Sequence, residues 1–70
     1  MNKDGLKKKL EEKGMNIKGL CKLSGINSTT MWRKLNGETE FNRDEMERIS
    51  KALNLTREEM LDIFFEKEVA

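Results

Sequence analysis

The feature that most constrains this chain is a stop-start signal that occurs three times along it. In each copy, a residue that tolerates the left-handed backbone comes first and an apolar residue follows. A residue whose side-chain oxygen can cap a helix comes last. The three copies are Gly14-Met15-Asn16, Gly25-Ile26-Asn27 and Asn54-Leu55-Thr56. Each copy therefore predicts that one helix ends and the next begins within a few residues.

Each apolar residue in these signals has an apolar partner five positions later, which is the spacing of a hydrophobic staple. The pairs are Met15 with Leu20, Ile26 with Met31 and Leu55 with Met60, and a fourth pair, Phe41 with Met46, brackets a cap at Asn42. Asn42 with Glu45 and Thr56 with Glu59 also fit the capping box. Together the signals predict helices at residues 3–13, 17–24, 28–36, 43–53 and 57–66.

The chain has 70 residues and no proline, with few aromatic and β-branched residues. This composition favours an all-α fold, and the length allows one domain, residues 1–70, with a small core. We expect the apolar residues that repeat at helical spacing to form that core. They are Leu6, Leu10, Leu20, Leu23, Met31, Leu35, Met46, Ile49, Leu53, Leu61, Phe64 and Phe65.

Several kinds of chemistry lack the residues that they need. There is no histidine, and Cys21 is the single cysteine, so neither an intramolecular disulfide nor a Cys/His zinc site can form. We therefore expect no enzyme, no cofactor and no small-molecule ligand. No apolar run approaches the roughly 20 residues of a membrane span, and the first residues lack the apolar stretch of a signal peptide. A cytosolic protein without a membrane partner is the default expectation.

The net charge of +1 conceals a marked asymmetry along the chain. Residues 13–37 hold five lysine or arginine residues and no acid, whereas residues 38–70 hold ten acids against five basic residues. One interpretation of the cationic stretch is a solvated helix face, which is the usual role of such charges. The other is a surface for a polyanion, with the acidic part directed away from it.

The connection around Gly25 is short enough to predict a helix-turn-helix from Ile17 to Asn36. On a helical wheel of the second helix, Met31 and Leu35 point inward. The outward positions are Thr29, Arg33 and Asn36, with Thr30 and Trp32 on the flanks and Ser28 near the exposed N-terminal end. Hydroxyl groups, an amide, an arginine and a tryptophan without any carboxylate suit the base edges of a DNA major groove.

Residues 15–37 resemble the helix-turn-helix of phage repressor and Cro-type regulators, the xenobiotic-response-element class. This stretch reads Met-Asn-Ile-Lys-Gly-Leu-Cys-Lys-Leu-Ser-Gly-Ile-Asn-Ser-Thr-Thr-Met-Trp-Arg-Lys-Leu-Asn-Gly. Residues 41–61 resemble the fourth and fifth helices of that family. The resemblance implies a compact five-helix, lambda-repressor-like domain that binds operator sites in double-stranded DNA, usually as a homodimer.

The resemblance also implies which residues meet the DNA. Base contacts fall on Ser28, Thr29, Trp32 and Arg33. Phosphate contacts fall on Asn16, Ile17, Lys18 and Asn36, and the charge pattern adds Lys22, Lys34 and Arg43. Each has an ordinary alternative: Arg33 and the lysines could be solvated, Ser28 and Thr29 could simply be first-turn residues, and Trp32 could pack on the flank of the core.

The sequence departs from the family pattern in four places. Ile17 replaces a common glutamine, Gly19 lies inside a helix, and Ser24 occupies a position that is usually apolar. Glu38 and Glu40 make the loop after residue 36 acidic, which counts against a phosphate contact there.

A single recognition helix reads only a few base pairs, so useful specificity predicts a dimer on two half-sites. We expect the dimer contact to involve some of Ile63, Phe64, Phe65 and Val69, although Phe64 and Phe65 could instead close the core of the monomer. The main functional hypothesis is a sequence-specific transcription regulator, such as a phage or mobile-element repressor. The alternative is a protein-interaction module that uses the acidic C-terminal half of the same scaffold.

Overall fold

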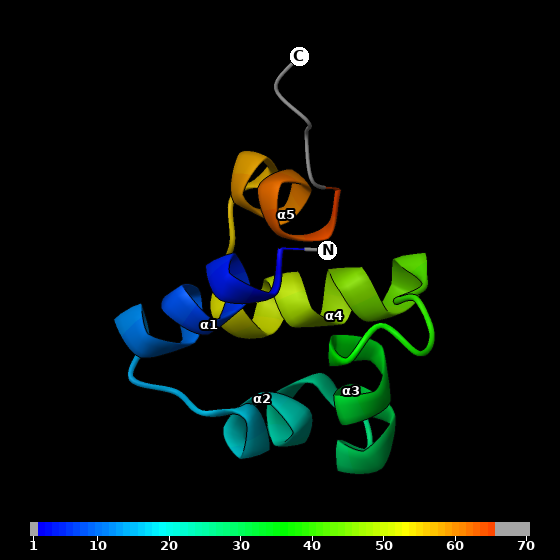
Figure 1. Ribbon diagram of the computed structural model, residues 1–70. Helices are drawn as coiled ribbons and strands as arrows, with labels where there is room; N and C mark the ends of the chain where they lie inside the picture. Colours follow the sequence, from blue (N-terminus) through cyan, green and yellow to red (C-terminus); the bar gives the residue numbers. More distant parts are fainter. Residues whose placement is uncertain (1, 66–70) are drawn as a thin grey trace.

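The computed structural model describes residues 2–65, and these residues form five helices and no strand. The helices are α1 (Lys3–Glu12), α2 (Ile17–Ser24), α3 (Ser28–Leu35), α4 (Arg43–Leu53) and α5 (Arg57–Phe64). Figure 1 shows their order in space. The all-α prediction is confirmed, and each predicted helix boundary lies within two residues of the observed one.

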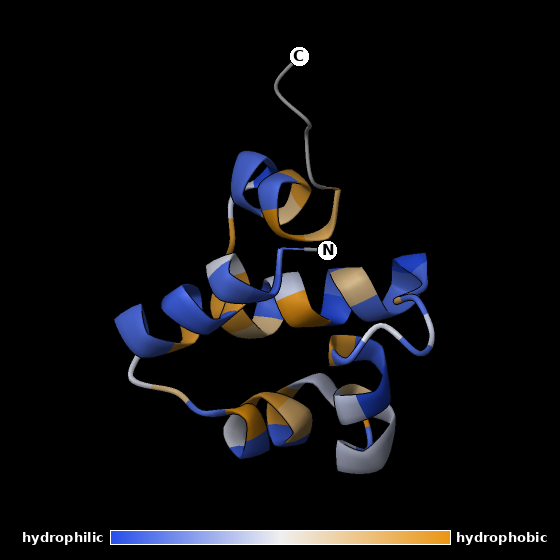
Figure 2. Ribbon diagram, viewed as in Figure 1, coloured by the Kyte–Doolittle hydropathy of each residue, from blue (hydrophilic) through white to orange (hydrophobic). Residues whose placement is uncertain are grey.

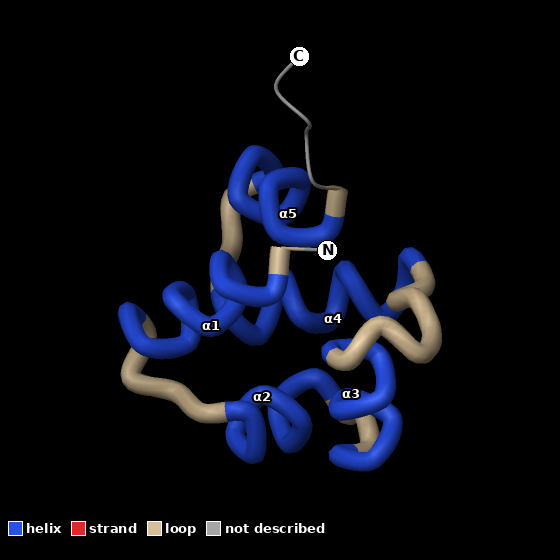
Figure 3. Tube along the Cα trace, viewed as in Figure 1, coloured by secondary structure: helices blue, strands red, loops and turns tan. Residues whose placement is uncertain are grey.

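The helix α4 lies in the middle of the molecule, with α2 and α3 on one side and α5 on the other. The α2–α3 pair packs on one side of α4 through α2, while α5 packs on α4 from the other side and also contacts α1 (Figures 1 and 3). The start of the chain is tied to α5, because the Asn2 amide donates a 2.6 Å hydrogen bond to the Ile63 carbonyl oxygen. The short α2–α3 unit therefore lies at the end of the molecule opposite α5.

The stop-start signals form as predicted. Gly14, Gly25 and Asn54 adopt positive φ angles of 64°, 72° and 52°, which are left-handed conformations that end a helix. Residues Asn16, Asn27, Asn42 and Thr56 cap the helices that follow, and both capping boxes are present. Local sequence thus sets where each of these helices begins.

The cap of α1 was missed by the sequence analysis. The Asn2 side chain accepts a 2.9 Å hydrogen bond from the Gly5 amide. The signal that could have found it is the spacing itself, because a capping side chain bonds to an amide two or three residues later.

Most of the predicted core is buried. The side chains of Leu6, Leu20, Met31, Ile49 and Leu53 are at most 1% exposed, and apolar residues turn inward between the helices (Figure 2). Residues predicted to be half of a staple, such as Met15 and Met60, pack against this core from its edge.

Two predictions of core residues are wrong. Leu23 is 63% exposed because Ser24 takes the inward position on the last turn of α2. Phe65 is 51% exposed because α5 ends at Phe64, earlier than predicted, and the backbone of Phe65 leaves the helical path with φ −121° and ψ 74°. Both helices form as predicted. The errors concern which face of α2 is buried and where α5 ends.

Among residues 2–65, no helix has both the length and the apolar character that crossing a bilayer would require.

Candidate nucleic-acid interface

The turn between α2 and α3 is built by a glycine and a buried polar residue. Gly25 donates its amide to the Cys21 carbonyl oxygen at 2.9 Å while its left-handed backbone reverses the chain. Ser24 is 5% exposed, and its hydroxyl donates a 2.7 Å hydrogen bond to the Leu20 carbonyl oxygen. This bond explains how a serine occupies a position that is usually apolar, since its polar atom is satisfied inside its own helix.

Cys21 lies at the buried face of α2. Burial raises the pKa of the Cys21 thiol, so the side chain stays neutral at pH 7. The residue therefore acts as a small packing element beside the turn.

The beginning of α2 combines a cap with a close approach. The Asn16 side chain accepts a 2.8 Å hydrogen bond from the Gly19 amide. A Cβ atom at position 19 would lie 3.2 Å from Cγ of Met15, which is tighter than ordinary van der Waals contact. Gly19 is thus explained by the room that the Met15 staple needs. The side chain of Ile17 packs against the core, so only its backbone amide could meet a phosphate.

The outward face of α3 has the composition that the wheel predicted. Met31 is 0% exposed and Leu35 is 7% exposed, so both close the core. The side chains of Ser28, Thr29, Trp32, Arg33 and Asn36 are exposed. Trp32 remains 49% exposed, which shows that the core does not take up its ring. The four residues predicted to contact bases therefore share the open side of one helix.

The cations of this region have no local counter-charge. Lys18, Lys22 and Arg33 are exposed, and in the described part of the chain none of them has a carboxylate oxygen within 4.0 Å. The start of α2 adds partial positive charge from its free amides. This end of the molecule consequently carries uncompensated positive charge.

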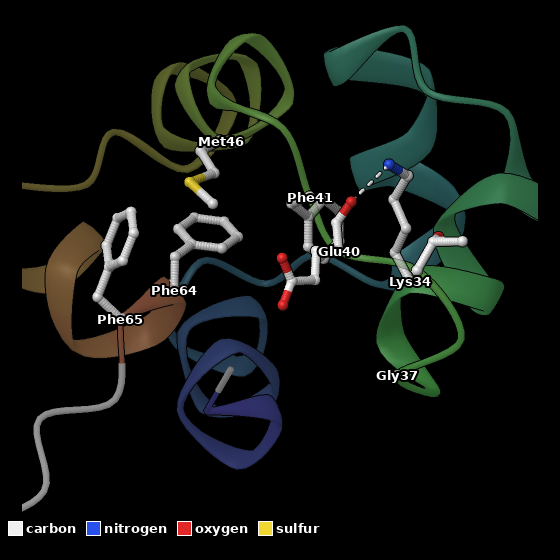
Figure 4. A pocket seen from close by; sticks show the side chains of 8 residues that line it. Lys34, Gly37, Glu40, Phe41, Met46, Phe64 and Phe65 are labelled. Carbon is white, nitrogen blue, oxygen red and sulfur yellow. Dashed lines mark hydrogen bonds between the residues drawn. The ribbon is translucent and has the colours of Figure 1, made fainter.

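Lys34 has two acceptors within the molecule. Its ammonium donates to the Glu40 carbonyl oxygen at 2.9 Å (Figure 4) and to the Glu45 carboxylate at 2.6 Å. The side chain is only 11% exposed. Lys34 therefore points toward the start of α4, and its predicted phosphate contact stays a prediction. Nothing in the local sequence signals this, because Glu45 lies 11 residues further along the chain.

The remaining predicted phosphate contacts are accessible. Asn36 ends α3 and is exposed. The Arg43 side chain is 94% exposed, and its Nε lies 4.0 Å from a Glu47 oxygen, at the limit of an ion pair. The loop between them carries exposed Glu38 and Glu40, so the acidic character noted in the sequence lies on the surface.

The predicted dimer contacts divide into two groups. Ile63 and Phe64 are 3% and 7% exposed, and the Phe64 ring meets the Phe41 ring edge to face with centroids 5.5 Å apart. Both residues close the monomer core, which for Phe64 is the alternative that the sequence analysis left open. Phe65 stays exposed and lines a groove of about 610 Å³ with Met46, Met60 and Leu61. Val69 lies outside the described residues.

Residues 2–65 contain no group of three or more histidine, cysteine, aspartate or glutamate side chains arranged to hold a metal ion.

Comparison with protein families agrees with this geometry. The family model for the Cro/C1-type HTH DNA-binding domain matches residues 5–66, from the first turn of α1 through the end of α5. No curated protein and no solved structure matches the chain.

Proposed function

The chain belongs to the family of Cro/C1-type helix-turn-helix DNA-binding domains, and from this premise we propose that it is a sequence-specific repressor of transcription. In this proposal α3 enters the major groove of an operator, and the bound protein blocks access to a promoter. The regulator is of the phage-repressor kind, and it binds as a homodimer on two half-sites.

The observation that carries the proposal is the exposed face of α3. Arg33 lies on it without an intramolecular carboxylate partner in the described part of the chain, so its two donor groups are available to O6 and N7 of guanine. Ser28 and Thr29 supply hydroxyl groups that donate or accept, and Trp32 supplies an apolar surface for a thymine methyl group. A helix face that contacts only solvent does not require an exposed tryptophan side chain.

Phosphate contacts would hold this face against the duplex. The amides of Ile17 and Lys18 belong to the first turn of α2 and have no intrahelical acceptor. Together with the side chains of Asn16, Lys18 and Lys22 they form one anchor, and Asn36 with Arg43 forms a second anchor on the other side of α3.

Site selection from random double-stranded DNA, followed by a salt titration, tests the proposal. We expect the recovered sites to share a sequence, and the affinity for such a site to fall steeply with salt. The slope of log K against log salt should be about −0.9 for each phosphate neutralised. Recovery of unrelated sequences, together with salt-insensitive binding to a basic protein, would instead support the protein-interaction module.

The dimer contact in this proposal is the groove beside Phe65. The groove between α4 and α5 is lined by Met46, Met60 and Leu61, and Phe65 stands at its edge. Three charged residues line the same groove, namely Arg43, Glu47 and Arg57. A two-fold axis could therefore place each Phe65 in the partner's groove and oppose these unlike charges, which is how a self-complementary interface works.

The dimer proposal predicts a change in mass. Wild-type protein should show a monomer–dimer equilibrium in sedimentation over a concentration series, and a selected two-half-site duplex should bind two copies. Phe65→Ala should shift the equilibrium toward monomer. Leu23→Ala removes another exposed apolar side chain, at the opposite end of the molecule, and should not shift it. A wild-type protein that stays monomeric, even on the duplex, would refute this contact.

A further inference from the structure

Lys34 has an unusual environment for a lysine on the helix that faces the proposed ligand. Its ammonium has two acceptors, the Glu40 carbonyl oxygen at 2.9 Å and the Glu45 carboxylate at 2.6 Å. It also lies 5.7 Å from the centre of the Phe41 ring, within the range of a cation–π contact. All three partners belong to the segment from residue 40 to residue 45, so one side chain joins α3 to the start of α4. Figure 4 shows Lys34 bonded to Glu40 near Phe41.

The Glu45 carboxylate serves two functions at once. The same oxygen, Oε1, accepts one hydrogen bond from the Lys34 ammonium and another, of 2.9 Å, from the Asn42 amide. The Glu45 amide in turn donates to the Asn42 side chain at 2.8 Å. Burial pushes the pKa of Glu45 upward, but the Asn42 amide and the Lys34 ammonium outweigh it, so the pKa is lowered overall. Glu45 is therefore charged at pH 7 and attracts the ammonium.

This pair adds a polar restraint to α3, whose Met31 and Leu35 are already buried in the core. Among the helices, α3 packs most closely on α2. The side chains of the pair are only 11% and 14% exposed, so water screens their attraction less than it screens a surface pair. Lys34 directly follows Trp32 and Arg33 in sequence, so a restraint at this turn limits rotation of the turn that carries both.

We propose that Lys34 is a positioning residue, which locks α3 against the beginning of α4 through Glu45 and so sets the direction in which Arg33 and Trp32 meet base edges. This inference rests on the proposed DNA-binding function. It also means that Lys34 neutralises no phosphate, because its charge is already matched by Glu45.

The test compares Lys34→Met with Lys22→Met, an exposed lysine on α2. Affinities for a duplex carrying the selected site and for a scrambled duplex are measured across a salt series, at a temperature where circular dichroism shows each variant folded. Lys34→Met should weaken binding to the selected site about tenfold, as one lost base contact would, and leave the scrambled duplex within about twofold. Its salt slope should match that of the wild type.

Lys22→Met should behave in the opposite way. Both affinities should fall together, and the magnitude of the salt slope should decrease by about 0.9. Glu45→Gln should reproduce Lys34→Met, and the double variant should be no worse than either single one, since both remove the same interaction. Lys34→Arg, which keeps a donor group, should restore most of the discrimination.

A second readout does not depend on DNA. Trp32 is the single tryptophan of the chain and lies on α3, so its emission reports on that helix. Lys34→Met and Glu45→Gln should each change the acrylamide quenching of Trp32 in the free protein, whereas Lys22→Met should not.

The inference is overturned if Lys34→Met lowers the salt slope and weakens both duplexes equally, because Lys34 is then a phosphate contact. It is also overturned if Lys34→Met reduces only the stability and leaves discrimination and quenching at wild-type values. If no variant, including the wild type, binds DNA, the proposed function fails, and the quenching result alone decides whether the restraint exists.

Discussion

The two ends of this molecule use their charged residues in different ways. In α1, α4 and α5, some cations are paired: Lys9 bridges Glu12 and Glu59, and Arg48 pairs with Asp44 at 3.0 Å. Other cations of these helices have no carboxylate oxygen within 4.0 Å in the described part of the chain; they are Lys3, Lys7, Lys8, Lys51 and Arg57. In α2 and the outward face of α3, Lys18, Lys22 and Arg33 have no such partner in the described part of the chain. The Lys9–Glu59 pair joins α1 to α5, whereas the cations of α2 and of the outward face of α3 are left open to solvent. Lys34 differs from Arg33, the other cation of α3, because it pairs with Glu45 of α4.

The largest expected effect concerns the stability of the end of the molecule that contains α2 and α3. It tests whether that end depends on buried apolar side chains. Leu20→Ala removes a side chain that is 0% exposed on α2 and should lower the free energy of unfolding by about 3 kcal/mol, within the range of large-to-small core substitutions. Leu23→Ala, on the same helix but 63% exposed, should change it by less than about 0.5 kcal/mol. Urea unfolding measures both, and equal losses would mean that Leu23 is buried.

The next effect separates the two ends by function. Arg33→Ala should cost about 1–3 kcal/mol of discrimination at one base pair of the selected site. Lys51→Ala, at an exposed lysine in the last turn of α4, should leave that discrimination unchanged. Competition binding with single-base variants of the site gives the profile. If Arg33→Ala weakens every duplex equally, Arg33 contacts a phosphate instead of a base.

The smallest effect is the loss of stability at low pH that comes from the Lys9–Glu59 pair between α1 and α5. The Lys9 ammonium, aided by the Thr56 amide, lowers the pKa of Glu59 from 4.5 to about 2. A lowered pKa in the folded state means that Glu59 stabilises the fold above pH 4.5 and loses this contribution as pH falls toward about 2. The urea midpoint of the wild type should decline through this window, and Glu59→Gln should decline less steeply.

Glu58→Gln is the matched control for this measurement. Glu58 is the adjacent residue, is exposed, and has no cation within 4.0 Å in the described part of the chain. Its variant should keep the acid dependence of the wild type. A Glu59→Gln profile identical to that of Glu58→Gln would show that the Lys9 pair does not form in solution.

The parts of the fold that the sequence predicts correctly depend on local interactions. A cap such as Asn16 and a left-handed residue such as Gly25 act within one helical turn, so their spacing is visible in the sequence. The prediction that Leu23 is buried is wrong because two leucines three residues apart do not fix which face of the helix points inward. On a wheel, Leu23 lies about 110° from the centre of the observed buried face, and the Ser24 hydroxyl bond let a polar residue occupy the inward position.

The candidate site follows the same division. The exposed side chains of α3 were predicted because Met31 and Leu35 fix the inward direction of that helix. The role of Lys34 could not be predicted, since it depends on where α4 begins relative to α3, which is a tertiary property. Whether the exposed residues meet bases or phosphates stays a prediction for the binding experiments above.

Gly19 links two positions of the chain in a way that bears on how such a sequence can change. An alanine there gains helix propensity, yet its methyl group would crowd Cγ of Met15 at 3.2 Å. A smaller residue at position 15 removes the crowding but weakens the contact that directs the chain into α2. We expect the two positions to vary together among descendants of this sequence, so that alanine at 19 becomes acceptable after a reduction in size at 15.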